Sequence, residues 1–92
     1  IILDPGIGFG KTVKQNLNLI SNIALLHSLG CPILLGSSRK SFIGKLHKNA
    51  LEEKRLGGSL STIIYALTQG VQVFRVHDVF ETSQAIKIFN KL

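Results

Sequence analysis

The chain has 92 residues, of which 45% are hydrophobic, and a formal net charge of +6. This length allows one domain at most, and no apolar run approaches the ~20 residues of a membrane-spanning helix, so we expect no membrane partner. The positive charge favours anionic partners. Because aromatic residues do not alternate with the basic ones, we expect phosphorylated small molecules rather than nucleic acid.

The first residue and the cysteine content indicate what kind of protein and compartment the chain comes from. It begins with Ile1 and contains no methionine, so we expect residue 1 to lie inside a longer protein. No basic segment followed by a small-residue cleavage site marks a signal peptide. The single cysteine, Cys31, cannot form an internal disulfide and fits a reducing compartment such as the cytoplasm.

Short apolar runs alternate with segments of helical periodicity. The predicted strands are 1–4, 33–36 and 71–77, and the predicted helices are 15–29, 57–69 and 82–92. A basic, less regular stretch occupies 39–55. The order β-α-β-α-β-α predicts an α/β protein with parallel strands joined by right-handed crossovers.

Polar residues follow all three predicted strands. Asp4 ends the first strand, the run Ser37–Ser41 follows the second, and Arg75 and His77 lie at the end of the third. The carboxyl ends of parallel strands meet at one edge, so these residues predict a single site. Strand alternation places Arg75 and His77 on one face. The alternative is an ordinary strand end in which Asp78 neutralises them.

The first of these segments is rich in glycine. A buried Asp4 suits a ligand with two adjacent N–H donors, such as an aminopyrimidine ring; the alternative is a carboxylate that caps the turn before Pro5. The spacing of Gly6, Gly8 and Gly10 matches neither a P-loop nor a dinucleotide fingerprint. Their simpler role is to let the backbone approach a ligand closely, with Phe9 free to contact it.

The second segment is basic. Lys40, Ser41 and nearby backbone N–H groups would favour an anion if the chain opens a helical turn there. The alternative is a solvated basic loop. His27 and His47 have no partner at metal-ligand spacing, so we expect no metal site in this chain.

Together these segments resemble dihydropteroate synthase, the folate-pathway enzyme that sulfonamides target. The resemblance rests on Asp-Pro-Gly-Ile-Gly-Phe-Gly-Lys at 4–11, Gly-Ser-Ser-Arg-Lys-Ser-Phe-Ile-Gly at 36–44 and Arg-Val-His-Asp-Val at 75–79. It implies that residues 1–92 are the C-terminal portion, the last three βα units, of one pterin-binding TIM (β/α)8 barrel domain. Such a barrel needs roughly 250 residues, so we expect an N-terminal part before Ile1 and no activity from this portion alone.

The resemblance also implies roles for individual residues. The family joins 6-hydroxymethyl-7,8-dihydropterin diphosphate to 4-aminobenzoate and releases diphosphate. By resemblance, the catalytic residues are Asp4, Lys40, Arg75 and His77. The pterin would be bound by Asp4, Gly36, Lys40 and Arg75, the aminobenzoate by Phe9, Lys40 and Ser41, and the diphosphate by Arg75 and His77.

The family further implies Mg²⁺, with its ligand in the part of the protein before Ile1, and a homodimer formed through the last helices. Three alternatives remain open. One is a pterin-binding domain that passes a methyl group to a corrinoid, which would not need the diphosphate-binding residues. Another is a non-catalytic fragment or interaction module, and the least favoured is a basic nucleic-acid binder.

Overall fold

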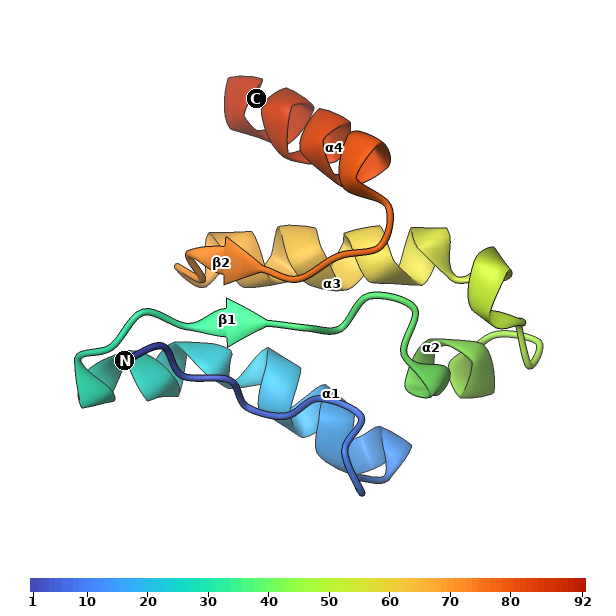
Figure 1. Ribbon diagram of the computed structural model, residues 1–92, viewed down its shortest axis with the longest axis horizontal. Helices are drawn as coiled ribbons and strands as arrows, with labels where there is room; N and C mark the ends of the chain where they lie inside the picture. Colours follow the sequence, from blue (N-terminus) through green and yellow to red (C-terminus); the bar gives the residue numbers. More distant parts are fainter.

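Parallel pairing holds the centre of the computed structural model, which describes residues 1–92 (Figure 1). Strand β1 (Leu34–Leu35) pairs with β2 (Val73–Phe74), and a parallel bridge joins Leu3 to Ile33. All three pairing segments therefore run in one direction, which confirms the predicted parallel arrangement. The regular strands are shorter than predicted, because the hydrogen-bond ladder between β1 and β2 is short. It runs from the bond between the Val73 N–H and the Ile33 carbonyl (3.2 Å) to the bond between the Arg75 N–H and the Leu35 carbonyl (3.1 Å).

The first helical region is divided in two. Helix α1 (Val13–Ser21) is followed by the 3₁₀ helix η1 (Ile23–Leu29), where the sequence predicted one helix over 15–29. A capping box between Thr12 and Gln15, with bonds of 2.9 and 3.1 Å, explains the earlier start. The break falls at Asn22, whose side-chain amide donates to the Asn18 carbonyl at 2.9 Å. Asn side chains that bond the backbone locally disfavour a continuing helix.

The basic stretch 39–55 contains a short helix, α2 (Ser41–Leu46), and one 3₁₀ turn, η2 (Glu52–Lys54). Helix α3 (Leu56–Thr68) agrees with the prediction to within a residue and is followed by Gly70 at φ 85°. Helix α4 (Val79–Lys91) begins three residues earlier than predicted. The added residues include Val79 and Phe80, which are exposed, so apolar periodicity does not mark them as part of the helix.

The helices follow and flank the strands (Figure 1). Helix α2 lies beyond the carboxyl end of β1, α3 runs beside the sheet, and α4 contacts α3. A single cluster of buried side chains lies between the sheet and the helices: Ile7, Ile20, Ile23, Ile33, Leu35, Phe42, Ile43, Ala66 and Val71. Each fully buried aliphatic side chain contributes about 1.5–3 kcal/mol relative to exposure. None of the helices has the length and apolar character that crossing a membrane requires.

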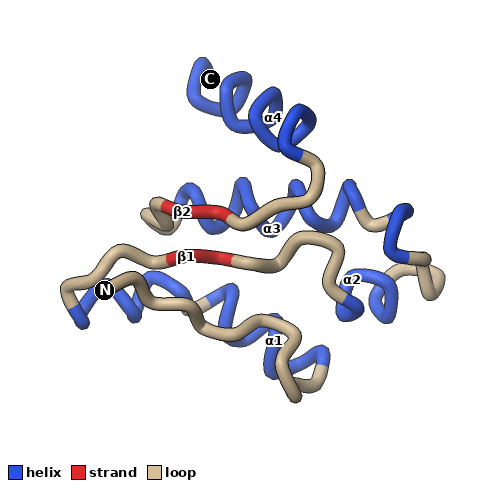
Figure 2. Tube along the Cα trace, viewed as in Figure 1, coloured by secondary structure: helices blue, strands red, loops and turns tan.

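Loops rather than regular strands form the edge at the carboxyl ends of the strands. Figure 2 shows that the segments leaving β1 and β2 are both irregular and run to the same side. The loop after the Leu3 bridge is held from within by Ile7, which is only 1% exposed. The fold therefore gathers three polar segments at one edge, as the order of strands and helices predicts.

Candidate functional site

A hollow of about 410 Å³ opens at this edge. It is lined by Asp4, Phe9, Gly36, Ser38, Lys40, Arg75, Val76 and His77. Six of the seven predicted site residues are among them, and they come from all three segments. A larger hollow of about 640 Å³ lies between the glycine loop and α1, but it has no carboxylate, histidine or arginine in its lining. The smaller hollow therefore holds the groups that can do chemistry.

The two oxygens of the Asp4 carboxylate contact different groups. One oxygen, Oδ1, accepts the Gly6 N–H at 2.9 Å, so the turn-capping role is present. The other, Oδ2, lies 3.5 Å from Nη1 of Arg75. Both side chains of this ion pair are partly exposed, at 38% and 55%, so the pair contributes little to stability. Oδ2 and the Arg75 guanidinium are consequently available to a ligand.

Gly36 lets Arg75 lie across the strand. A Cβ at position 36 would come within 3.0 Å of the Arg75 Cζ and closer still to its Nη2. Only glycine leaves room for the guanidinium in this position. Gly36, one of the residues expected at the pterin, therefore leaves room for the Arg75 guanidinium.

A cation–π contact joins the first two segments. The Lys40 ammonium lies 4.5 Å from the centroid of the Phe9 ring, which is 66% exposed. Gly8 permits this contact, because its φ is 87° and a Cβ there would lie 3.0 Å from the Lys40 side chain. The buried amide of Asn16 accepts the Gly8 N–H at 2.9 Å and fixes the loop. Sequence reasoning missed Asn16, since nothing in a helical pattern marks one buried amide.

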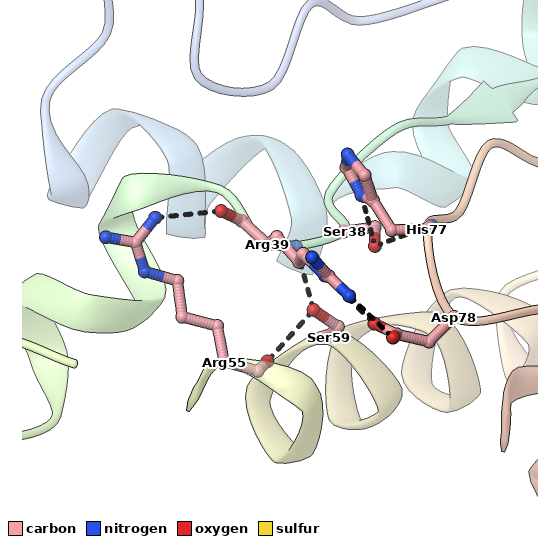
Figure 3. A network of polar contacts seen from close by, with 6 residues as sticks. All are labelled: Ser38, Arg39, Arg55, Ser59, His77 and Asp78. Carbon is pink, nitrogen blue, oxygen red and sulfur yellow. Dashed lines mark hydrogen bonds and ion pairs between the residues drawn. The ribbon is translucent and has the colours of Figure 1, made fainter. Parts of the chain in front are cut away.

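His77 is held from the second segment by Ser38 (Figure 3). The Ser38 hydroxyl lies 3.0 Å from Nδ1 of His77, and its oxygen accepts the His77 N–H at 3.2 Å. Ser38 is 4% exposed. Sequence reasoning did not single out this residue as a neighbour of His77, because the two are 39 positions apart and meet only through β1 and β2.

Asp78 binds Arg39 rather than Arg75 or His77. The Arg39 guanidinium donates to the carboxylate through Nη2 at 2.8 Å and through Nε at 3.2 Å. These hydrogen bonds, with the charge of the guanidinium, hold the pKa of Asp78 below its ordinary value and raise the pKa of Arg39. The alternative in which Asp78 neutralises Arg75 and His77 is therefore wrong, and both residues are left to face the hollow.

The same loop carries a strained backbone. Arg39 has φ 56°, a conformation that costs a non-glycine residue about 1–2 kcal/mol. Ser59 of α3 and Arg55, the N-cap of α3, stabilise it (Figure 3): its N–H donates to the Ser59 hydroxyl at 2.8 Å, and its carbonyl accepts from Arg55 at 2.9 Å. The loop that presents Lys40 is thus anchored to the start of α3.

Ser41 does not reach the hollow. It is the first residue of α2 and is exposed, with Lys40 in the N-cap position.

The chain also lacks a cluster of metal-binding side chains, because no three of its His, Cys, Asp and Glu side chains lie together. His27 lies away from the hollow, with Nε2 2.8 Å from the Gln69 carbonyl oxygen.

Comparison with known proteins agrees with this geometry. Residues 1–77 match the family described as pterin binding enzyme. The chain is 49% identical over 88 residues to the dihydropteroate synthase of Clostridium beijerinckii, covering 96% of this chain and 33% of that protein. Two solved structures of the Xanthomonas albilineans dihydropteroate synthase, one with 7,8-dihydropteroate and one with 4-aminobenzoic acid, are each 39% identical at a TM-score of 0.94.

Both structural matches cover 98% of this chain, and 34% and 33% of the solved chains. The chain thus spans about a third of the length of the proteins it matches. The structural likeness confirms the predicted fold class, part of a (β/α)8 barrel. On the sequence match over residues 1–77, the chain belongs to the pterin-binding enzyme family.

Proposed function

We propose that this chain forms part of the active site of a dihydropteroate synthase. The observation that carries the proposal is the hollow itself, which combines a carboxylate (Asp4), an aromatic ring beside an ammonium (Phe9 and Lys40) and an anion-binding pair (Arg75 and His77). Each group matches one part of the reactants: a pterin, an aminobenzoate and a diphosphate. One relative, the Xanthomonas albilineans enzyme, was solved with 7,8-dihydropteroate and with 4-aminobenzoic acid, which supports these ligands.

In this scheme the pterin lies against Asp4 and Arg75. Its ring N–H and amino group donate to the Asp4 carboxylate, whose Oδ2 makes only the long contact to Arg75. The guanidinium of Arg75 lies over Gly36 and stacks on the pterin ring. Lys40, from the opposite wall, adds a hydrogen bond. Hydrogen bonds to charged groups contribute about 1.5–3 kcal/mol each.

The reaction then exchanges one bond for another. The bond between the pterin methylene carbon and the diphosphate oxygen breaks, and the diphosphate leaves with the electron pair. Arg75 and His77 stabilise the departing anion, and Asp4 stabilises the cationic character that develops on the pterin. The amine of 4-aminobenzoate, held by Phe9 and Lys40, attacks the methylene carbon, and one of its protons passes to solvent as the C–N bond forms.

Several parts of the whole enzyme belong to this proposal and not to the described site. They are residues 1–92 as the C-terminal portion of one domain, Ser41 at the aminobenzoate carboxylate, a homodimer, a cytoplasmic location and Mg²⁺ bound by residues outside this chain. Residues 1–92 contain no group of three or more His, Cys, Asp and Glu side chains that could hold the ion. A corrinoid methyltransferase would not need Arg75 and His77 in the hollow, so the geometry favours the synthase.

The test is calorimetry on the full-length protein with a dihydropterin analogue. Asp4→Asn keeps the shape of the side chain but removes the charge, so we expect at least about tenfold weaker binding, since one charged hydrogen bond is lost. Glu53→Gln is the matched control, because Glu53 is an exposed carboxylate in η2, away from the hollow. Equal affinity of wild type and Asp4→Asn would exclude the proposed pterin contact.

A further inference from the structure

Ser38 makes two contacts with one histidine. Its oxygen accepts the His77 backbone N–H at 3.2 Å, and the same hydroxyl lies 3.0 Å from the ring atom Nδ1. The other ring nitrogen, Nε2, points away from Ser38 (Figure 3). His77 and Ser38 both line the hollow, so their contact lies at its wall.

The direction of the Ser38–Nδ1 hydrogen bond follows from counting donors. The hydroxyl has one proton, and a buried hydroxyl proton needs an acceptor. The backbone N–H of His77 already donates to the Ser38 oxygen, and Nδ1 is the one other group that this hydroxyl bonds. If Nδ1 carried a proton, the hydroxyl would receive two N–H donors and its own proton would have no partner.

We propose that Ser38 is a positioning residue that fixes neutral His77 in the tautomer with its proton on Nε2. Ser38 donates to Nδ1, so Nδ1 is unprotonated and Nε2–H is the ring's donor. The hollow then offers an anion two kinds of donor, the Arg75 guanidinium and the Nε2–H of His77. The ligand chemistry, a diphosphate leaving group, rests on the proposed function; the tautomer does not.

The tautomer can be read directly by nitrogen NMR on the full-length protein labelled with ¹⁵N-histidine. In alkaline buffer, an unprotonated ring nitrogen resonates far downfield of a protonated one. His77→Gln identifies the His77 signals by their loss. We expect the downfield signal on Nδ1 in the wild type, and the opposite assignment would overturn the inference without any further variant.

Ser38→Ala and Ser37→Ala form a matched pair. Both serines are buried, at 4% and 1% exposure, but Ser37 bonds the Thr62 hydroxyl at 2.7 Å and not His77. We expect Ser38→Ala to shift His77 towards the Nδ1–H tautomer and Ser37→Ala to leave it unchanged. An unchanged ring in Ser38→Ala would overturn the inference.

Calorimetry with inorganic diphosphate separates this inference from the proposed function. We expect about tenfold weaker binding to Ser38→Ala, since one well-directed hydrogen bond is lost. If the wild type does not bind diphosphate but the tautomer still depends on Ser38, the inference holds and the proposed role in leaving-group binding fails. If diphosphate binds both proteins equally and the tautomer does not change, the inference fails and the proposed function stands.

Discussion

Arg39 and Asp78 share two hydrogen bonds, of 2.8 and 3.2 Å, that join the loop after β1 to the residue before α4. Arg39 directly precedes Lys40, and Asp78 directly follows His77. The ion pair therefore fixes the separation of two walls of the hollow without occupying it. Its contribution depends on pH, because Arg39 holds the pKa of the Asp78 carboxylate below its ordinary value.

The sign of this dependence follows from the lowered pKa. Below the ordinary pKa of 3.8, the unfolded chain protonates Asp78 before the folded chain does. Stability from the pair is thus fully present above that value and is lost as the pH falls through the lower, folded pKa. We expect wild type to melt higher than Asp78→Asn at pH 7, and the difference to shrink as the pH falls below 3.8.

The melting temperatures of wild type and Asp78→Asn, measured from pH 7 to below pH 3.8, test this expectation. Glu81→Gln, in the first turn of α4, controls for a general change of charge near this end of the helix. A difference between wild type and Asp78→Asn that stays constant down to the lowest pH would contradict the assigned pair.

Gly36→Ala tests the close approach of Arg75. The new Cβ would meet the guanidinium, whose Cζ lies 3.0 Å from that position, and would displace it from the hollow. Under the proposed synthase activity, we expect kcat/KM of the full-length protein to fall about tenfold or more, because the proposed charged contact to the pterin is lost or misplaced. The side chain of Arg75 is half exposed, so it can move aside and the melting temperature should change little. A fully active Gly36→Ala enzyme would show that the position of the guanidinium does not matter.

Phe9→Ala separates ligand binding from folding. The ring is 66% exposed, so its removal should change the free energy of unfolding by less than about 0.5 kcal/mol. It should nevertheless weaken 4-aminobenzoate binding, because the ring and the Lys40 ammonium 4.5 Å away form one wall of the hollow. Phe80→Ala is the control, since Phe80 is 75% exposed on α4 and does not line the hollow. Equal binding by the two variants would contradict the proposed contact between Phe9 and the aminobenzoate.

Two adjacent glycines in α3 should respond in opposite ways to alanine. A Cβ at Gly58 would collide with the Ile43 side chain, whereas a Cβ at Gly57 would meet nothing within 4 Å. We expect Gly57→Ala to raise the free energy of unfolding by up to about 1 kcal/mol, the usual gain in helix propensity. Gly58→Ala should lower it by about 1–3 kcal/mol through overpacking. Denaturant titration of the two variants checks both signs.

The sequence predicts the site better than it predicts the local backbone. Asp4, Gly36 and Arg75 could be placed together because each ends or follows a strand, and parallel strands end at one edge. The break in the helical region at Asn22 could not be predicted, because it depends on one side-chain amide that competes for a helix carbonyl. Apolar periodicity continues through that position and carries no sign of the competition.

The sequence also did not show which charged residues pair with one another. Asp78 lies beside Arg75 and His77 along the chain, yet it pairs with Arg39 from another segment. Arg39 makes this pair with φ 56°, a conformation held by Ser59 of α3 and by Arg55 just before that helix. Only a three-dimensional structure brings those contacts together, and the same holds for Ser38 and His77.

In the loop between Leu3 and α1, one residue anchors the loop in the buried cluster and another lines the hollow. Ile7 is 1% exposed and belongs to the buried cluster, whereas Phe9 is 66% exposed and lines the hollow. Selection can therefore exchange the ring at position 9 for another side chain without loosening the loop that presents it. Ligand preference at this wall and the folding of the chain can evolve independently.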